Sequence, residues 1–314
     1  MNRTLRDRDP PLRCNRSMRK QTWESRGLSY ASELTLQNLT DLLAILRWNV
    51  DHDIHFYRSS SKLVPWHSQF DLADLPDFDE ISDVAERIGS FVTDHDVRLT
   101  FHPDYWCKLA SPSADTVDRS LTDIENHASW FDLMGLPYSP YYGVNVHIGA
   151  RYDGKPETAA RFRTAVDRLS PAARAHLTVE NDDNESLWSV SELVRAVGDP
   201  LRVPVVFDYH HHAFSGRDLS YREAFDLARS TWDGITPVTH YSEPACLHGE
   251  DARPQAHAQY VADLPRWLRT ASDVMIEADG KETALFRVRD GDRPLVPPAW
   301  TTARENRPMQ LASS

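Results

Sequence analysis

Short apolar runs rich in β-forming residues alternate with amphipathic stretches along most of the chain. The runs predict seven strands, at 54–58, 97–101, 141–146, 176–180, 203–207, 236–240 and 273–277. The stretches predict helices at 31–50, 78–95, 115–134, 157–169, 189–197, 221–231 and 256–270. Such alternation is typical of βαβ units and a parallel sheet. It predicts an α/β fold of the (β/α)8 TIM-barrel class whose first strand is truncated or absent, because nothing before residue 31 resembles a strand.

The ends of the chain differ from this pattern. Residues 1–27 are basic and contain two prolines, which predicts an irregular N-terminal arm or loop at the start of a single barrel domain spanning 1–288. Residues 289–314 are Pro-rich and polar, which predicts a poorly ordered tail. No apolar run has the length of a membrane span, and the N-terminus lacks the apolar core of a signal peptide. Three scattered cysteines do not form a disulfide framework, so we expect a reducing cytoplasm.

The charge balance restricts the kind of partner. The chain has 47 acidic residues against 35 Lys and Arg, for a net charge of -12. This charge argues against membrane residence and against binding of nucleic acid through a simple basic patch. A DNA partner would therefore need a local positive groove or bound metal cations.

The residues at the ends of the last six predicted strands share one chemical property, because each can bind a metal ion. They are His102, His147, Glu180, Asp208, His240 and Glu277. The carboxyl ends of barrel strands form the active-site face, so these side chains are expected to converge. Histidine and carboxylate ligands together suit Mn²⁺, Zn²⁺ or Fe, and their number predicts two or three ions. Such a site lowers the pKa of a water and holds the attacking and leaving oxygens of a phosphodiester.

Each of these residues also has a purely structural interpretation. A single His after a strand is commonly a solvated loop residue, and the run of His at 210–212 could be a turn. Glu180 and Asp208 could cap the helices that follow them. Six such residues at six strand ends together favour the metal site.

A loop directly after His102 contains two large aromatic residues, Tyr105 and Trp106. Aromatic side chains at the mouth of a site can stack on a base or wedge into a duplex. The alternative is that Trp106 packs against neighbouring loops. Lys108 follows in the same loop and is expected to contact DNA phosphates.

Eight segments of the chain resemble the UV damage endonucleases, in the same order as in that family. They are FYRSSSKLVPW (56–66), LTFHPDYW (99–106), NVHIGARYDGK (145–155), LTVENDD (177–183), VVFDYHH (205–211), THYSE (239–243), QAHAQY (255–260) and DVMIEADGKE (273–282). The resemblance implies a (β/α)8 barrel with a cluster of divalent metals, usually manganese. It also implies nicking of DNA immediately 5′ to UV photoproducts, which leaves a 3′-hydroxyl and a 5′-phosphate.

The resemblance also implies a set of site residues. Those matching family metal ligands are His102, His147, Glu180, Asp208, His211, His240, His257 and Glu277. Of these, Glu180, His102 and His240 are the expected catalytic residues. His257 lies at the start of the helix predicted over 256–270, and it owes its place in the set mainly to the resemblance.

The sequence departs from the family at several positions. A further ligand falls on either Gln69 or His67, and Val238 stands where the family has a modified metal-site lysine, which leaves the third metal open. Tyr105 and Trp106 match the lesion-probing pair. Asn2 matches a lesion-contacting Asn near the end of a first strand that would precede Met1.

The function expected from these features is metal-dependent DNA repair. The protein would be a cytoplasmic, monomeric endonuclease that acts on damaged double-stranded DNA with two or three ions, preferably Mn²⁺, with Zn²⁺ or Mg²⁺ as alternatives. A metal-dependent sugar isomerase or epimerase is one alternative, but it would need fewer His ligands and no exposed Tyr-Trp pair. A lesion-binding protein with weak or no nuclease activity is another, motivated by the missing strand and by Val238.

Overall fold

A computed structural model describes residues 2–216 and 218–291 of the chain. Within these residues seven strands occur, and their order in the sheet is their order in the chain. The strands are β1 (Phe56–Ser59), β2 (Arg98–Phe101), β3 (Val144–His147), β4 (Leu177–Glu180), β5 (Val205–Asp208), β6 (Val238–Tyr241) and β7 (Asp273–Ile276). All seven predicted strands are present, and the predicted fold class, an α/β barrel lacking its first strand, is confirmed.

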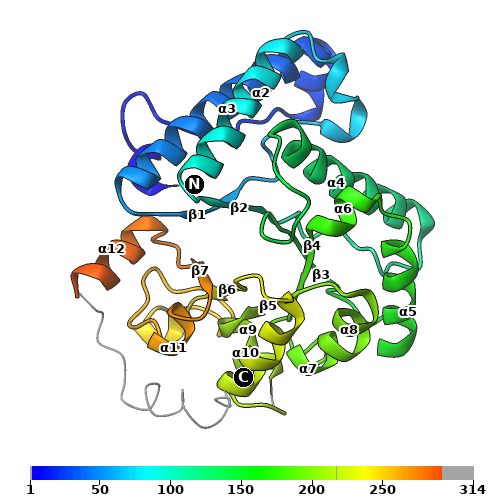
Figure 1. Ribbon diagram of the computed structural model, residues 1–314, viewed down its shortest axis with the longest axis vertical. Helices are drawn as coiled ribbons and strands as arrows, with labels where there is room; N and C mark the ends of the chain where they lie inside the picture. The colour runs from blue at the N-terminus through cyan, green and yellow to red at the C-terminus, as the bar shows by residue number, and fades with distance from the viewer. Residues whose placement is uncertain (1, 217, 292–314) are drawn as a thin grey trace. The chain divides into compact units, whose positions relative to one another are not determined.

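Helices occupy most connections between the strands (Figure 1). The α-helices are α1 (Arg3–Arg6), α2 (Lys20–Asp51), α3 (Phe78–Asp94), α4 (Ala114–Leu133), α5 (Lys155–Val166), α6 (Pro171–His176), α7 (Val190–Leu193), α8 (Asp199–Leu201), α9 (Tyr209–Ser215), α10 (Tyr221–Arg229), α11 (Arg266–Arg269) and α12 (Glu282–Asp290). Shorter helical turns are η1 (His67–Gln69), η2 (Leu72–Asp74), η3 (Val194–Gly198), η4 (Ser230–Trp232) and η5 (Ala245–His248).

The chain packs as two compact units. The first unit contains residues up to 107, 115–144 and 168–176, and the second contains 108–114, 145–167 and the chain from 177 onward. The first unit therefore includes β1, β2 and the long helices α2 to α4. The second includes β4 to β7 and the helices that follow them.

In the first unit, β1 and β2 pair in parallel with Phe56 opposite Arg98. Helices α2 and α3 lie side by side, in blue and cyan in Figure 1. Apolar residues of α3 at a spacing of three to four are fully buried, including Ile81, Ile88 and Val92. This spacing places them on one face of the helix, which is the pattern that predicted it.

In the second unit, β4, β5, β6 and β7 pair successively in parallel. Strands β4, β5 and β6 are buried along their whole length, as expected for parallel strands covered on both faces. The register places Asp208 of β5 beside His240 of β6. The sheet itself therefore brings two of the predicted ligands together.

Two expectations about local structure are wrong. Residues 1–27 are not irregular throughout, because α1 forms and α2 begins at Lys20, with a non-helical Gly27 inside it. Trp23 in this early part of α2 stacks on Trp66 at 5.5 Å, a tertiary contact that stabilises the added turns.

The helix predicted over 256–270 is limited to α11. The backbone N–H of Ala258 donates to Glu243 instead of to a helical carbonyl, and Pro265 directly precedes α11. Pairing with the segment after β6 thus replaces helix formation around His257.

Helix α12 runs to Asp290, and residues 292–314 of the expected tail lie outside the described residues. Among the described helices, none is both long enough and apolar enough to cross a bilayer.

Gly89→Ala is expected to destabilise the fold. A Cβ at Gly89 of α3 would lie 1.7 Å from the backbone oxygen of Met134, so the two segments must separate. Ala normally stabilises a helix relative to Gly by about 1 kcal/mol, whereas here we expect a loss of about 1–3 kcal/mol. Urea unfolding measures the difference, with exposed Ser90→Ala as the control. A more stable Gly89→Ala variant would contradict the close packing.

Candidate metal centre

The predicted ligands of the second unit lie at the carboxyl ends of its strands. His147, Glu180 and Asp208 are the last residues of β3, β4 and β5. His240 lies in β6, and Glu277 directly follows β7. Because these strands are parallel, their carboxyl ends share one edge of the sheet.

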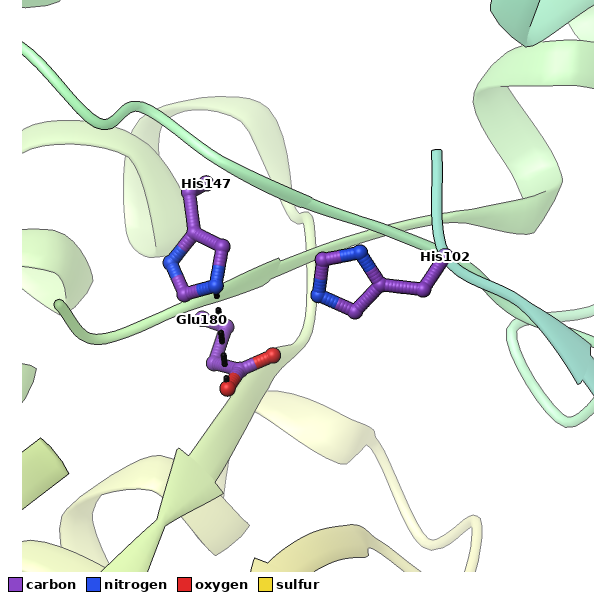
Figure 2. A group of neighbouring side chains, drawn as sticks. All are labelled: His102, His147 and Glu180. Carbon is purple, nitrogen blue, oxygen red and sulfur yellow. Dashed lines mark ion pairs between the residues drawn. The ribbon is translucent and has the colours of Figure 1, made fainter. Parts of the chain in front are cut away.

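Glu180 is at the centre of this group. Its side chain is 1% exposed, and three His nitrogens surround it: His240 Nδ1 at 3.0 Å, His211 Nδ1 at 3.4 Å and His147 Nε2 at 3.8 Å. Figure 2 shows the His147 ring directed at the Glu180 carboxylate. Contacts with the three His rings therefore account for the burial of Glu180 without a helix-capping role.

His240 lies among three carboxylates. Its Nδ1 is 3.0 Å from Glu180, 3.3 Å from Glu277 and 3.9 Å from Asp208. Glu180, Asp208 and His240 each offer a ligand atom, and these atoms lie within 4.8 Å of one another. All three side chains are buried, so their donor atoms are shielded from water.

The two carboxylate oxygens of Asp208 have different surroundings. Oδ1 accepts a hydrogen bond of 2.7 Å from the backbone N–H of His211 and so caps α9. Oδ2 is buried and has no hydrogen-bond partner among the described residues. A buried charged oxygen without a donor is costly, and a metal ion would satisfy it. The residues present therefore fit a divalent cation.

The electrostatics of the group indicate an excess of buried negative charge. Burial, together with the nearby carboxylates of Glu180 and Glu277, raises the pKa of Asp208 to about 7. Burial opposes the charged form of His147, but Glu180, Asp182 and Asp208 outweigh it and raise the pKa of His147 to about 9. The raised pKa values mean that Asp208 and His147 retain protons, which offset the negative charge of the buried carboxylates. A divalent cation would offset the same charge at a metal site.

Neighbouring oxygen atoms orient the His rings. Asp182 Oδ1 forms an ion pair of 3.3 Å with His147 Nδ1, and the carbonyl oxygen of Asn181 lies 2.9 Å from His211 Nδ1, within hydrogen-bond distance. Metal-binding His residues commonly have one ring nitrogen hydrogen-bonded in this way, which leaves the other to bind the metal.

Sequence reasoning missed Asn145, which supports Glu180. Its side-chain amide donates to Glu180 Oε2, and its own oxygen accepts from Thr178 Oγ1 at 3.0 Å. Asn145 precedes His147 by two residues in β3, so both face the same side of the sheet. This two-residue spacing in a strand was the feature of the sequence that could have identified Asn145.

His210, His211 and His212 lie in α9 and not in a solvated turn. His211 contacts the carboxylates, which raise its pKa against the effect of burial. Burial lowers the pKa of His210 to about 3, with help from His257 and His211, and lowers that of His212 to about 4. The Nε2 atoms of the outer two lie at hydrogen-bond distance from the backbone carbonyls of Gln255 and Leu219, whereas the middle one faces the carboxylates of Glu180 and Asp208.

His257 lies in the long segment between β6 and α11. Its Nδ1 is 2.7 Å from Ser242 Oγ, and its ring lies 4.8 Å from that of His210. Burial lowers the pKa of His257, so the ring is neutral and able to act as a ligand. Ser242 is a second supporting residue that sequence reasoning missed, and only its place two residues after His240 hinted at it.

The remaining predicted ligands belong to the first unit. His102, also drawn in Figure 2, directly follows β2, and its Nδ1 lies 3.0 Å from the carbonyl oxygen of Pro103. His67 packs against Phe70 and Trp130, and burial lowers its pKa to about 4. Gln69 is exposed. The roles of His102, His67 and Gln69 in metal binding stay predictions.

The predicted DNA-contacting residues differ in exposure. Tyr105 is 88% exposed and Trp106 is 43% exposed, so Trp106 is not a packed core residue. Trp106 lines a cavity of about 500 Å³ in the first unit, together with Trp66, His67, Asp123 and Trp130.

The other predicted positions are less accessible. The Lys108 ammonium lies 3.4 Å from the carbonyl oxygen of Gly149. Asn2 is buried and donates to Asn49 at 2.6 Å. Val238, at the lysine position of the family, is buried in β6.

The stability of the protein in a chelator is expected to fall as the pH rises from 6.5 to 9. A folded-state pKa of about 9 means that His147 stabilises the fold fully below its unfolded pKa of 6.5, and that this contribution is lost as the pH passes 9. The loss is on the order of 3 kcal/mol, or roughly 5–10 °C in Tm. Thermal melts in EDTA measure it.

Two controls accompany this pH series. His147→Gln should flatten the decline, because the titrating ring is absent. Saturating Mn²⁺ should also reduce it, because a metal favours the deprotonated ligands. A Tm in EDTA that does not change between pH 6.5 and 9 would contradict the charge distribution described for His147.

Comparisons with known proteins identify the family of this chain. The family model described as UV-endonuclease UvdE matches residues 1–294. A UV-damage endonuclease of Schizosaccharomyces pombe is 33% identical over 300 residues, which cover 92% of this chain and 49% of that protein. A UV DNA damage endonuclease of Bacillus cereus (strain G9842) is 30% identical over 269 residues, covering 81% and 80% of the two chains. The chain thus spans about half the length of the first relative and four-fifths of the second.

A solved structure has a similar fold. The crystal structure of SacUVDE matches with a TM-score of 0.76 at 24% identity, covering 91% of this chain and 96% of that one. The resemblance noted in the eight sequence motifs is confirmed. By the family model and the two curated relatives, the chain belongs to the UV-endonuclease UvdE family.

Proposed function

We propose that this protein is a metal-dependent DNA repair endonuclease that nicks duplex DNA immediately 5′ to UV photoproducts and other distorting lesions. The observation that carries the proposal is the buried cluster of Glu180, Asp208 and His240 in a chain of the UvdE family. We further propose that it acts as a monomer in the cytoplasm.

The proposed metal ligands are the eight strand-end and loop residues that the sequence predicts. They are His102, His147, Glu180, Asp208, His211, His240, His257 and Glu277. Mixed imidazole and carboxylate donors suit Mn²⁺ best, with Zn²⁺ and Mg²⁺ as alternatives, and the number of donors suits two or three ions. Bound divalent cations would lower the pKa of a water and stabilise the leaving oxygen of the phosphodiester.

The side chains have distinct tasks in this proposal. Glu180 contacts three His rings, so it would hold a divalent cation together with them. His240 and His102 complete the proposed catalytic set. Asn145 holds the Glu180 carboxylate through its amide, and this support limits the orientations that Glu180 can adopt.

Lesion recognition is assigned to the loop after β2. Tyr105 and Trp106 present exposed aromatic faces, and we propose that they fill the gap in the duplex where damaged bases are extruded. A damaged site is less costly to unstack, which favours extrusion there over undamaged DNA. Lys108 would contribute a phosphate contact near the same loop.

Nicking of UV-irradiated supercoiled plasmid tests the function. We expect conversion to open circles that requires Mn²⁺, is confined to irradiated plasmid and is lost in Glu180→Gln. Tight binding of irradiated DNA without nicking would support the lesion-binding alternative instead. Equal nicking of irradiated and untreated plasmid would contradict lesion specificity.

A further inference from the structure

The segment that carries His257 is long but is tied to the end of β6. Residues 242–265 contain only the single turn η5, and loops of this length without other regular structure are usually mobile or functional. Here the N–H of Ala258 donates to the Glu243 carbonyl at 2.8 Å, and that of Ala245 donates to Ala256 at 2.8 Å. These bonds flank His257 on both sides.

The side-chain carboxylate of Glu243 forms a second set of contacts with the segment. It is fully buried, and its Oε1 accepts a hydrogen bond of 2.9 Å from the Tyr241 hydroxyl. Its Oε2 accepts from His248 Nε2 at 2.7 Å and from the backbone N–H of Ala262 at 2.9 Å. The donors come from β6, from η5 and from the stretch after His257. One carboxylate therefore joins both limbs of the segment to the strand.

A buried carboxylate is costly unless several donors satisfy it, so these contacts depend on one another. Gln at this position would keep the shape of the side chain. However, its amide nitrogen would replace either Oε1, which faces the Tyr241 hydroxyl, or Oε2, which faces both His248 and the Ala262 N–H, so at least one of these contacts would change. The two backbone bonds described above would remain, as would those that the N–H groups of Asp279 and Gly280 donate to the carbonyls of Ala258 and Gln259.

We infer that Glu243 is a positioning residue that fixes the segment so that His257 is presented to the metal centre. Ser242, its neighbour in the chain, bonds to His257 Nδ1 at 2.7 Å, so adjacent residues set both the orientation of the ring and the position of its backbone. Glu243 lies only three residues after His240, yet two of its three side-chain contacts, with His248 and Ala262, join it to the rest of the segment. The inference rests on the proposed role of His257 as a ligand.

The test compares Glu243→Gln, His257→Ala and the double variant in the full chain, with exposed Glu157→Gln as the matched control. Isothermal titration with Mn²⁺ is expected to show an affinity about 10–100-fold lower for one ion in Glu243→Gln, the range found for groups that orient metal ligands. His257→Ala should lose at least as much. The double variant should lose no more than His257→Ala, because Glu243 acts through His257.

Hydrogen exchange provides a readout that does not depend on metal. In EDTA, amide exchange over 244–262 should be faster in Glu243→Gln than in the wild type or Glu157→Gln, while β4 and β5 stay protected. If His257→Ala weakens Mn²⁺ binding and Glu243→Gln does not, the inference alone is overturned. Additive losses in the double variant would overturn it too. If His257→Ala leaves Mn²⁺ binding unchanged, that ligand assignment fails, and the inference fails with it.

Discussion

Replacing Glu180 with Gln is expected to lower the rate of Mn²⁺-dependent nicking by about 10³-fold, equivalent to about 4 kcal/mol. The Glu180 carboxylate is buried and lies within 4 Å of three His rings, so no other side chain of the cluster can take its place. Gln keeps the size of the side chain, and its oxygen can still accept the hydrogen bond from Asn145. Initial rates on irradiated plasmid measure the change.

Measurements of Mn²⁺ affinity and of secondary structure distinguish a loss of metal binding from a loss of folding in Glu180→Gln. Glu180→Gln should also bind Mn²⁺ more weakly by titration, whereas its circular dichroism spectrum should match that of the wild type. Exposed Glu24→Gln makes the same chemical change far along the chain and should leave both rate and affinity unaltered. A Glu180→Gln variant that nicks at the wild-type rate would remove Glu180 from the catalytic set.

Trp106→Ala is expected to raise the KM for a lesion-containing duplex by about 30-fold. Stacking of a base on an aromatic ring contributes about 1–3 kcal/mol, and the half-exposed ring of Trp106 is available for it. The kcat at saturating DNA and the affinity for Mn²⁺ should change little, because the ring is not among the ligands. Kinetics on a duplex with a single photoproduct measure both constants.

A matched control exists in the same unit. Tyr138 is 60% exposed and lies outside the loop after β2, so Tyr138→Ala removes an exposed aromatic ring without an expected effect on KM. Trp106→Phe should recover most of the loss, because it restores a stacking face. An unchanged KM in Trp106→Ala would show that lesion recognition does not depend on this ring.

The strands, and the convergence of His and carboxylate side chains at their ends, could be predicted from sequence for one reason. A short apolar run has a high propensity to form a β-strand, and a His or a carboxylate at its end marks a sharp change in polarity. Both features can be read from the sequence itself. Asp208 illustrates this, because β5 ends at this residue and its Oδ2 remains directed at the cluster. Its capping role was equally visible, and the cap uses Oδ1 and leaves Oδ2 without a hydrogen-bond partner among the described residues.

The segment around His257 could not be predicted in this way. Its sequence is compatible with a helix, but the backbone of Ala258 pairs with Glu243, which is 15 residues away in the chain. Contacts between residues that are distant in the chain override the local propensity for a helix, and the spacing of apolar residues does not reveal such contacts. The same applies to Lys20 at the start of α2, where stacking of Trp23 on Trp66 stabilises turns that a basic, polar stretch did not suggest.

Supporting residues were missed because their chemistry is ordinary. Asn145, Asp182 and Ser242 are common polar residues, and only their contacts with Glu180, His147 and His257 distinguish them. Each lies within two residues of a predicted ligand. Proximity in the chain to a strand-end ligand is therefore a usable signal for such residues, although not a specific one.

Anomalous diffraction from crystals grown with Mn²⁺ tests the central claim most directly, since it locates the ions without reference to activity. The account predicts Mn²⁺ peaks bonded to Glu180, Asp208 and His240, with at least one further peak that includes His147 or His257. Mn²⁺ confined to surface carboxylates, with none bonded to Glu180, would contradict the assignment of this cluster as the metal centre.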